Sequence, residues 1–112
     1  MNIAVVRGQV LREPVERELA SGTQLSIDLN VSYEEGPNET VEVVWLNPPD
    51  KSRWPRQGVE VFVTGRVRRR FFRLSNGQTA GRMELVADTV LTAKQTRQIN
   101  RRLEAVAADV AG

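Results

Sequence analysis

One stretch, residues 59–78, limits the choice of fold more than any other part of the chain. Its first half alternates apolar and other residues with period two, the pattern of a β-strand with one buried face. Asn76-Gly77 follows, and this dipeptide is a strong hairpin signal because both turn residues accept a positive φ. The sequence therefore predicts a long strand that turns back in a tight hairpin.

The alternation divides this strand into two faces. We expect the face with the valines, from Val59 to Val67, to lie in the core together with Phe71. Arg69 interrupts that face, which predicts a β-bulge or a strand end nearby. The opposite face presents three arginines and one ring, namely Arg66, Arg68, Arg70 and Phe72.

The second face has the composition of a surface that binds single-stranded nucleic acid. Side chains two residues apart on a strand lie about 7 Å apart, a spacing that suits a phosphate backbone. A ring among guanidinium groups offers a base a surface on which to stack. The alternative is an edge strand made basic to prevent edge-to-edge aggregation. These residues alone leave both interpretations open.

Charge is distributed unevenly along the chain. Residues 1–60 contain 6 basic and 10 acidic residues, whereas residues 61–112 contain 10 basic and 4 acidic ones. Six arginines and no acid lie between Val61 and Met83. Arginine forks onto phosphates and stacks on bases, so this asymmetry favours a polyanionic partner.

The composition argues against an enzyme. The chain contains no cysteine and no histidine, which removes thiol chemistry, the commonest general base and the commonest transition-metal ligand. It also lacks a P-loop and a glycine fingerprint. We therefore expect no cofactor, no metal and no small-molecule substrate. Without a membrane-length apolar run or a leader-like start, the expected location is the cytoplasm, with no membrane partner.

Four further strands are predicted, over residues 2–10, 24–33, 41–46 and 79–91. Five strands joined by turns favour an all-β, five-stranded OB-fold barrel over residues 1–92, with an SH3-like barrel as the second choice.

Two features lie outside this strand pattern. Trp54, in the interrupted segment 51–58, either plugs the end of the core or stands exposed as a second stacking surface. Residues 93–112 form a C-terminal helix or tail, with a helix over about 93–108 capped by Thr92. Its apolar stripe consists of Ile99, Leu103, Val106 and Val110.

Several segments resemble the bacterial single-stranded-DNA-binding (SSB) proteins. The opening Asn-Ile-Ala-Val-Val-Arg-Gly-Gln-Val-Leu, with Glu-Pro-Val-Glu-Arg and Ser-Gly-Thr after it, resembles the start of that family. The segment Gly58-Val-Glu-Val-Phe-Val-Thr-Gly-Arg-Val-Arg-Arg-Arg-Phe-Phe, with Asn-Gly-Gln after it, resembles the most recognisable block of the family. The similarity covers about residues 2–91, and residues 65–72 are its specific part.

This resemblance implies a function and several site residues. It implies single-stranded DNA binding without sequence preference, in DNA replication, repair and recombination, by a homodimer or homotetramer. Phe72 falls where the family has a stacking tryptophan, and Arg68 and Arg70 fall at basic positions beside it. Tyr33 falls close to the position at which the family has a second stacking tryptophan.

The sequence also departs from the family. The family's third-strand aromatics fall near Val41 and Asn47, which are not aromatic, and the acidic C-terminal tail is missing. The resemblance therefore implies a short divergent paralogue with fewer stacking surfaces.

The sequence predicts single-stranded DNA binding, and these residues do not decide whether RNA also binds. The alternative is an OB-fold protein-interaction or oligomeric accessory module that has lost most DNA binding. The predicted DNA-binding residues are Arg66, Arg68, Arg70, Phe72, Arg73, Tyr33 and Trp54.

Overall fold

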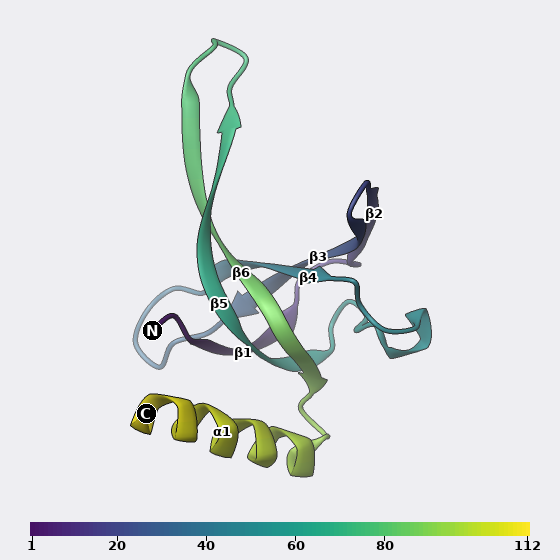
Figure 1. Ribbon diagram of the computed structural model, residues 1–112, viewed down its shortest axis with the longest axis vertical. Coiled ribbons are helices and arrows are strands. Elements are labelled where there is room, and N and C mark those ends of the chain that lie inside the picture. Colours follow the sequence, from purple (N-terminus) through teal and green to yellow (C-terminus); the bar gives the residue numbers. More distant parts are fainter.

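Six strands form one sheet that curls into a barrel, with a helix outside it (Figure 1). The computed structural model describes residues 1–112. The strands are β1 (Ala4–Val10), β2 (Val15–Leu19), β3 (Gly22–Val31), β4 (Glu39–Leu46), β5 (Glu60–Arg73) and β6 (Thr79–Thr92). A 3-10 turn, η1 (Lys51–Arg53), precedes β5, and helix α1 (Thr96–Ala111) follows β6.

The strand order β1-β5-β6-β4-β3-β2 closes on itself, because β1 also pairs with β3. That closing contact is short and joins Gln9 to Asn30 and Val10 to Leu29. Five strands therefore form a ring, and β2 extends one edge of it. The predicted all-β, five-stranded OB-fold barrel with a C-terminal α-helix is confirmed.

β2 is the strand that the sequence analysis missed. It forms a hairpin with β3, and all five of its residues are exposed. Because the segment is short and neither of its faces is buried, it carries no alternation of buried and exposed side chains that could mark a strand.

The main core cluster is aliphatic apart from one tryptophan, and Phe62 is buried outside this cluster. The predicted inward residues of β3, Leu25, Ile27 and Leu29, are fully buried, as are Val61 and Val63 of β5. Burying one such side chain contributes about 1.5–3 kcal/mol relative to leaving it exposed. The remaining core residues are Val10, Val43, Trp45, Leu85 and Ala87.

The pairing of β5 with β6 changes at Gly65. Thr64 pairs with Thr89 but Gly65 pairs with Ala87, so Asp88 of β6 has no partner. The predicted bulge near Arg69 is therefore wrong in position, since the register shift lies at Thr64/Gly65. The strands approach closely here, because a Cβ on Gly65 would lie 2.0 Å from the carbonyl oxygen of Val86.

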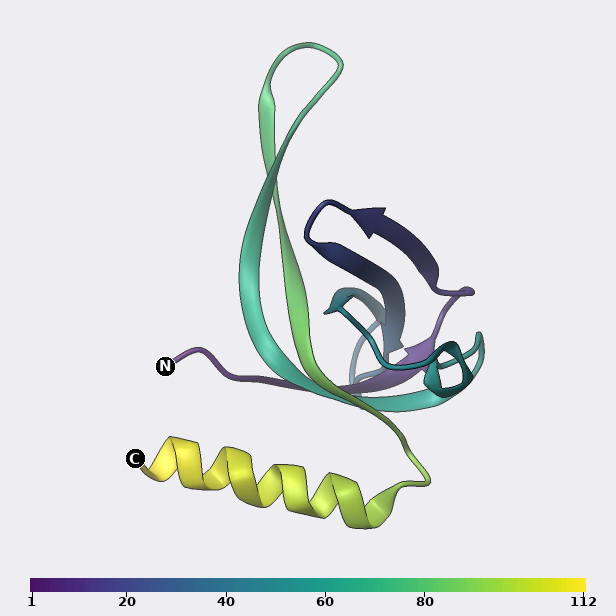
Figure 2. The same cartoon turned by 45° about the vertical axis from the view of Figure 1, so that its right-hand side comes forward.

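Beyond Gly65, β6 stays paired with β4 as far as Leu85, and past that point β5 and β6 leave the barrel as a two-stranded ribbon (Figures 1 and 2). This departure overturns the prediction that Phe71 lies in the core, because its ring is 65% exposed. Val67, on the same face, is also exposed. Phe71 does share a face with the valines of β5, but the core ends before β5 does.

Helix α1 begins at Thr96 rather than at residue 93. Thr92 is not its cap, because it ends β6 and donates its backbone N–H to the Gln95 side chain at 2.9 Å. Figures 1 and 2 show α1 along the outside of the barrel, below β1 and β5. None of its residues is buried. The helix is also not long and apolar enough to cross a membrane.

The close approach at Gly65 generates a stability prediction. Gly65→Ala should lower the free energy of unfolding by about 1–3 kcal/mol or more, because backbone atoms must move to admit the methyl group. Urea unfolding followed by circular dichroism measures this loss. Gly81→Ala is the matched control, since its nearest neighbour would be the flexible Arg69 side chain at 3.1 Å. Equal urea midpoints for Gly65→Ala and the parent chain would contradict the prediction.

Candidate nucleic-acid interface

The ribbon formed by β5 and β6 beyond Gly65 carries most of the predicted binding residues. Its pairing is unbroken from Gly65 opposite Ala87 to Arg73 opposite Thr79, so directly opposed residues share a face. We call one side the arginine face; it consists of Arg66, Arg68, Arg70 and Phe72 with Val86, Glu84, Arg82 and Ala80. The other side is the Phe71 face; it consists of Val67, Arg69, Phe71 and Arg73 with Leu85, Met83, Gly81 and Thr79.

The structure brings four of the seven predicted residues together. Arg66, Arg68, Arg70 and Phe72 share one face, as the period of the strand predicts. Arg73 lies on the opposite face of the ribbon. A role for Arg73 in binding stays a prediction.

Carboxylates hold two arginines of the arginine face in place. Arg68 Nε lies 2.7 Å from Glu84 Oε1, and Glu84 is only 4% exposed. Arg82 Nη1 lies 3.0 Å from Glu42 Oε1 on the neighbouring strand β4. A buried carboxylate without its cation would be costly, so Glu84 ties Arg68 to one position. Arg66 and Arg70 form no ion pair and stay free to meet an anion.

The ring of Phe72 is half-buried and already has a cationic neighbour. The Arg82 guanidinium carbon lies 5.4 Å from the ring centroid, within the range of a cation–π contact. Because Arg82 is also paired to Glu42, the ring, guanidinium and carboxylate form one connected unit. This unit offers a base both the accessible part of a ring and a planar guanidinium.

A small pocket of about 150 Å³ is lined by residues of β2, β3, β4 and the two ribbon strands. Figure 2 shows the β2–β3 hairpin beside the ribbon. Arg17 of β2 and Arg70 of β5 both line the pocket, with Asp28, Glu42 and Glu84. Each of these three carboxylates is paired with an arginine, and no group of side chains is arranged to hold a metal ion. Sequence reasoning missed Arg17, because β2 itself was not recognised.

The Phe71 face differs from the arginine face in having no acidic residue. Phe71 and Arg69 both lie across Gly81, since a Cβ there would be 3.3 Å from Phe71 Cε1 and 3.1 Å from Arg69 Cδ. The Cε1 edge of the ring therefore lies close to Gly81, while most of the residue stays exposed. The alternation signal placed Phe71 correctly on its face, but the position of the barrel's end was needed to show that it is exposed.

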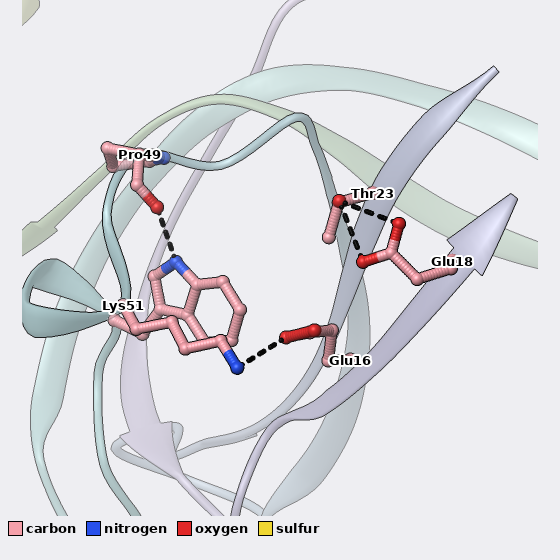
Figure 3. A network of polar contacts seen from close by, with 6 residues as sticks. Glu16, Glu18, Thr23, Pro49 and Lys51 are labelled. Carbon is pink, nitrogen blue, oxygen red and sulfur yellow. Dashed lines mark hydrogen bonds and ion pairs between the residues drawn. The ribbon is translucent and has the colours of Figure 1, made fainter.

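Trp54 directly follows η1, and this segment between β4 and β5 lies away from the ribbon (Figure 1). Trp54 is half-buried, packs against the core and donates its indole N–H to the Pro49 carbonyl at 2.7 Å. Lys51 Nζ lies 5.6 Å from the ring centroid and is paired with Glu16 at 3.3 Å (Figure 3). Trp54 therefore packs against the core without being fully buried, which decides neither of the two predicted roles.

Tyr33 follows the end of β3, in the loop that leads to β4. Its side chain is exposed and forms no hydrogen bond to the ribbon. The structure therefore does not join Tyr33 or Trp54 to the arginine face, and a role for either in binding stays a prediction.

No protein-family model matches this sequence, and no curated protein does so at the level of sequence. Similarity appears when folds are compared. The mitochondrial single-stranded DNA-binding protein Rim1 of S. cerevisiae matches with a TM-score of 0.65 at 18% identity. That match covers 81% of this chain and 93% of Rim1.

A second crystal structure of the yeast protein matches with a TM-score of 0.66 at 17% identity, over 81% of this chain and 93% of that one. Plasmodium falciparum SSB, in its complex with single-stranded DNA, matches with a TM-score of 0.67 at 17% identity. The match covers 82% of this chain and 94% of the Plasmodium chain. At these identities the similarity establishes that the chain has the OB-fold of SSB proteins.

Proposed function

We propose that this protein binds single-stranded DNA without sequence preference, through the arginine face of the β5–β6 ribbon, and catalyses no reaction. The arginine face itself carries the proposal. It sets unpaired guanidinium groups beside a ring on a ribbon that stands clear of the barrel. Charge that tracks a backbone, combined with a surface for stacking, is how sequence-tolerant single-strand binding works.

Three arginines of β5 on this face can interact with phosphates, in two different ways. Arg66 and Arg70 have no carboxylate partner and can each neutralise a phosphate. Arg68 uses its Nε to bind Glu84 and keeps its terminal N–H groups, because a guanidinium has five donors in all. The pair to Glu84 lowers the charge available from Arg68 but orients what remains.

Phe72 and Arg82 would receive the bases. Every base has a π-face, so stacking on a ring or a guanidinium is tolerant of sequence. The carboxylates of the neighbouring pocket discourage a phosphate from entering it. We infer that the strand lies with its phosphates toward Arg66 and Arg70.

The structural neighbours support this assignment. The Plasmodium protein was crystallised with single-stranded DNA, and the yeast proteins are single-stranded DNA-binding proteins of mitochondria. A role in DNA replication, repair and recombination, and assembly into a homodimer or homotetramer, complete the proposal. The same face would also accept RNA, because its contacts are to phosphates and to the faces of bases.

A protein-interaction module is the second candidate, and one observation favours it. Several apolar side chains stay exposed on the ribbon and the helix, including Phe71, Met83, Leu103 and Val110. Such side chains suit a protein partner better than a phosphate. A titration with a single-stranded oligonucleotide distinguishes the two functions, because only the DNA-binding function requires that the protein bind the oligonucleotide.

The unpaired arginines predict a definite salt dependence. Each phosphate neutralised on a single strand contributes about −0.7 to the slope of log K against log salt. Two or three contacts should therefore give a slope between about −1.4 and −2.1 by that rule. Fluorescence anisotropy of a labelled dT oligomer over a salt series measures it. The double variant Arg66→Gln/Arg70→Gln should lose about 1.4 of this slope. A slope near zero in the parent protein would rule out the arginine face as the binding surface.

Phe72 predicts the contribution of stacking. Phe72→Ala should weaken binding of the dT oligomer by roughly 1–3 kcal/mol, the usual cost of removing one stacking surface. Phe62→Ala is the control, because Phe62 is 6% exposed and belongs to the barrel. It should lower stability by roughly 3–5 kcal/mol while the folded fraction binds normally. Unchanged affinity in a folded Phe72→Ala protein would count against stacking on this ring.

A further inference from the structure

The two faces of the β5–β6 ribbon resemble each other in composition, although only one follows from the sequence resemblance. Each carries arginines and one phenylalanine on β5, because arginine occupies both odd and even positions between residues 66 and 73. In a two-stranded ribbon these faces point in opposite directions. A ligand on one face therefore leaves the other face free.

Each face has two unpaired arginines, but the Phe71 face contains no carboxylate. Arg69 and Arg73 lie opposite Met83 and Thr79, and neither arginine forms an ion pair. On the arginine face, by contrast, Glu84 lies directly opposite Arg68. The Phe71 face thus holds two positive charges that nothing in the protein balances.

Phe71 is also the more accessible ring. It is 65% exposed, whereas Phe72 is half-buried and has Arg82 against it. Gly81, which has no side chain, lies opposite Phe71 and close to the Cε1 edge of its ring. Arg69 and Arg73 flank the ring along the strand at intervals of about 7 Å. This order of charge, ring and charge matches phosphate, base and phosphate along a single strand.

An apolar groove continues this face toward the barrel. Its volume is about 540 Å³, and its apolar lining comes from Ala4, Val6, Val41, Val67, Met83 and Leu85. The two carboxylates at its rim, Glu42 and Glu84, are paired with arginines. An unstacked base could enter this groove without meeting an unbalanced negative charge.

We propose that the ribbon binds a second single strand on its Phe71 face, so that one protein molecule holds two separate strands. This inference rests on the proposed function of the arginine face and extends it to strand bridging. The unbalanced charge favours a nucleic acid over a protein on this face, because a protein partner would need carboxylates placed against Arg69 and Arg73. The six arginines between Val61 and Met83 reduce the repulsion between two strands held on one ribbon.

Bridging is tested with two dT oligomers, one carrying a donor dye and the other an acceptor dye. These oligomers cannot pair, so energy transfer between them reports that one assembly holds both. The full chain should produce energy transfer, and raising the salt concentration should abolish it. The variant Arg69→Gln/Phe71→Ala/Arg73→Gln should lose the transfer but bind one labelled oligomer within about twofold of the parent affinity.

The matched variant Arg66→Gln/Arg70→Gln/Phe72→Ala changes the same three residue types on the arginine face. It should also lose the transfer, and it should bind a single oligomer more weakly than the first variant does. Neither variant removes a core side chain, so both should melt near the parent temperature. Sedimentation velocity gives the assembly mass of each protein in the same buffer.

The outcomes separate the two proposals. Failure of the parent protein to bind one oligomer would overturn the proposed function itself. Binding of one oligomer without energy transfer would overturn bridging alone, and so would transfer that survives in the Phe71-face variant. A smaller assembly mass in that variant, with unchanged transfer per protomer, would assign the face to a protein partner instead.

Discussion

The close approach of β5 and β6 at Gly65 is the contact on which the rest of the molecule depends. The absence of a side chain lets the Val86 carbonyl lie where a Cβ would be, and the unpaired Asp88 shifts the register at the same point. Before this point the inward residues of β5 fill the core. After it, the same strand continues without a core to fill, and its two faces become two surfaces.

The free ribbon lets a modest barrel present the large exposed surface to which we assign DNA binding. The barrel supplies stability through its mostly aliphatic interior, and the arginines and both phenylalanines of the ribbon lie outside that core cluster. The ribbon carries the arginines, which would be costly inside a barrel because a buried charge must be paired. The core residues and the residues that we propose for DNA binding thus lie mainly in different parts of the same two strands.

The carboxylates near the arginines reduce the positive charge of the ribbon and also hold arginine side chains in position. Glu84 and Glu42 reduce the positive potential of the arginine face while fixing Arg68 and Arg82 against the sheet. A long exposed side chain loses conformational entropy when it binds a ligand. Arginines that an ion pair already holds in place lose less entropy on binding. The unpaired arginines are less restrained but contribute their full charge; these are Arg66, Arg69, Arg70 and Arg73. The ribbon combines both kinds on its two sides.

Local pattern determined a large part of this protein. Period-two alternation and the Asn-Gly turn were enough to predict the long hairpin, the shared face of Arg66 to Phe72 and the inward residues of β3. These features depend on neighbours within one strand, so the sequence records them directly. The limits of the core were decided by the tertiary structure. The exposure of Phe71, the register shift at Gly65, the exposed strand β2 and the pairing of Arg82 with Glu42 depend on where distant strands meet or end. No periodicity within one segment encodes those meeting points, because they arise only when the ring of strands closes.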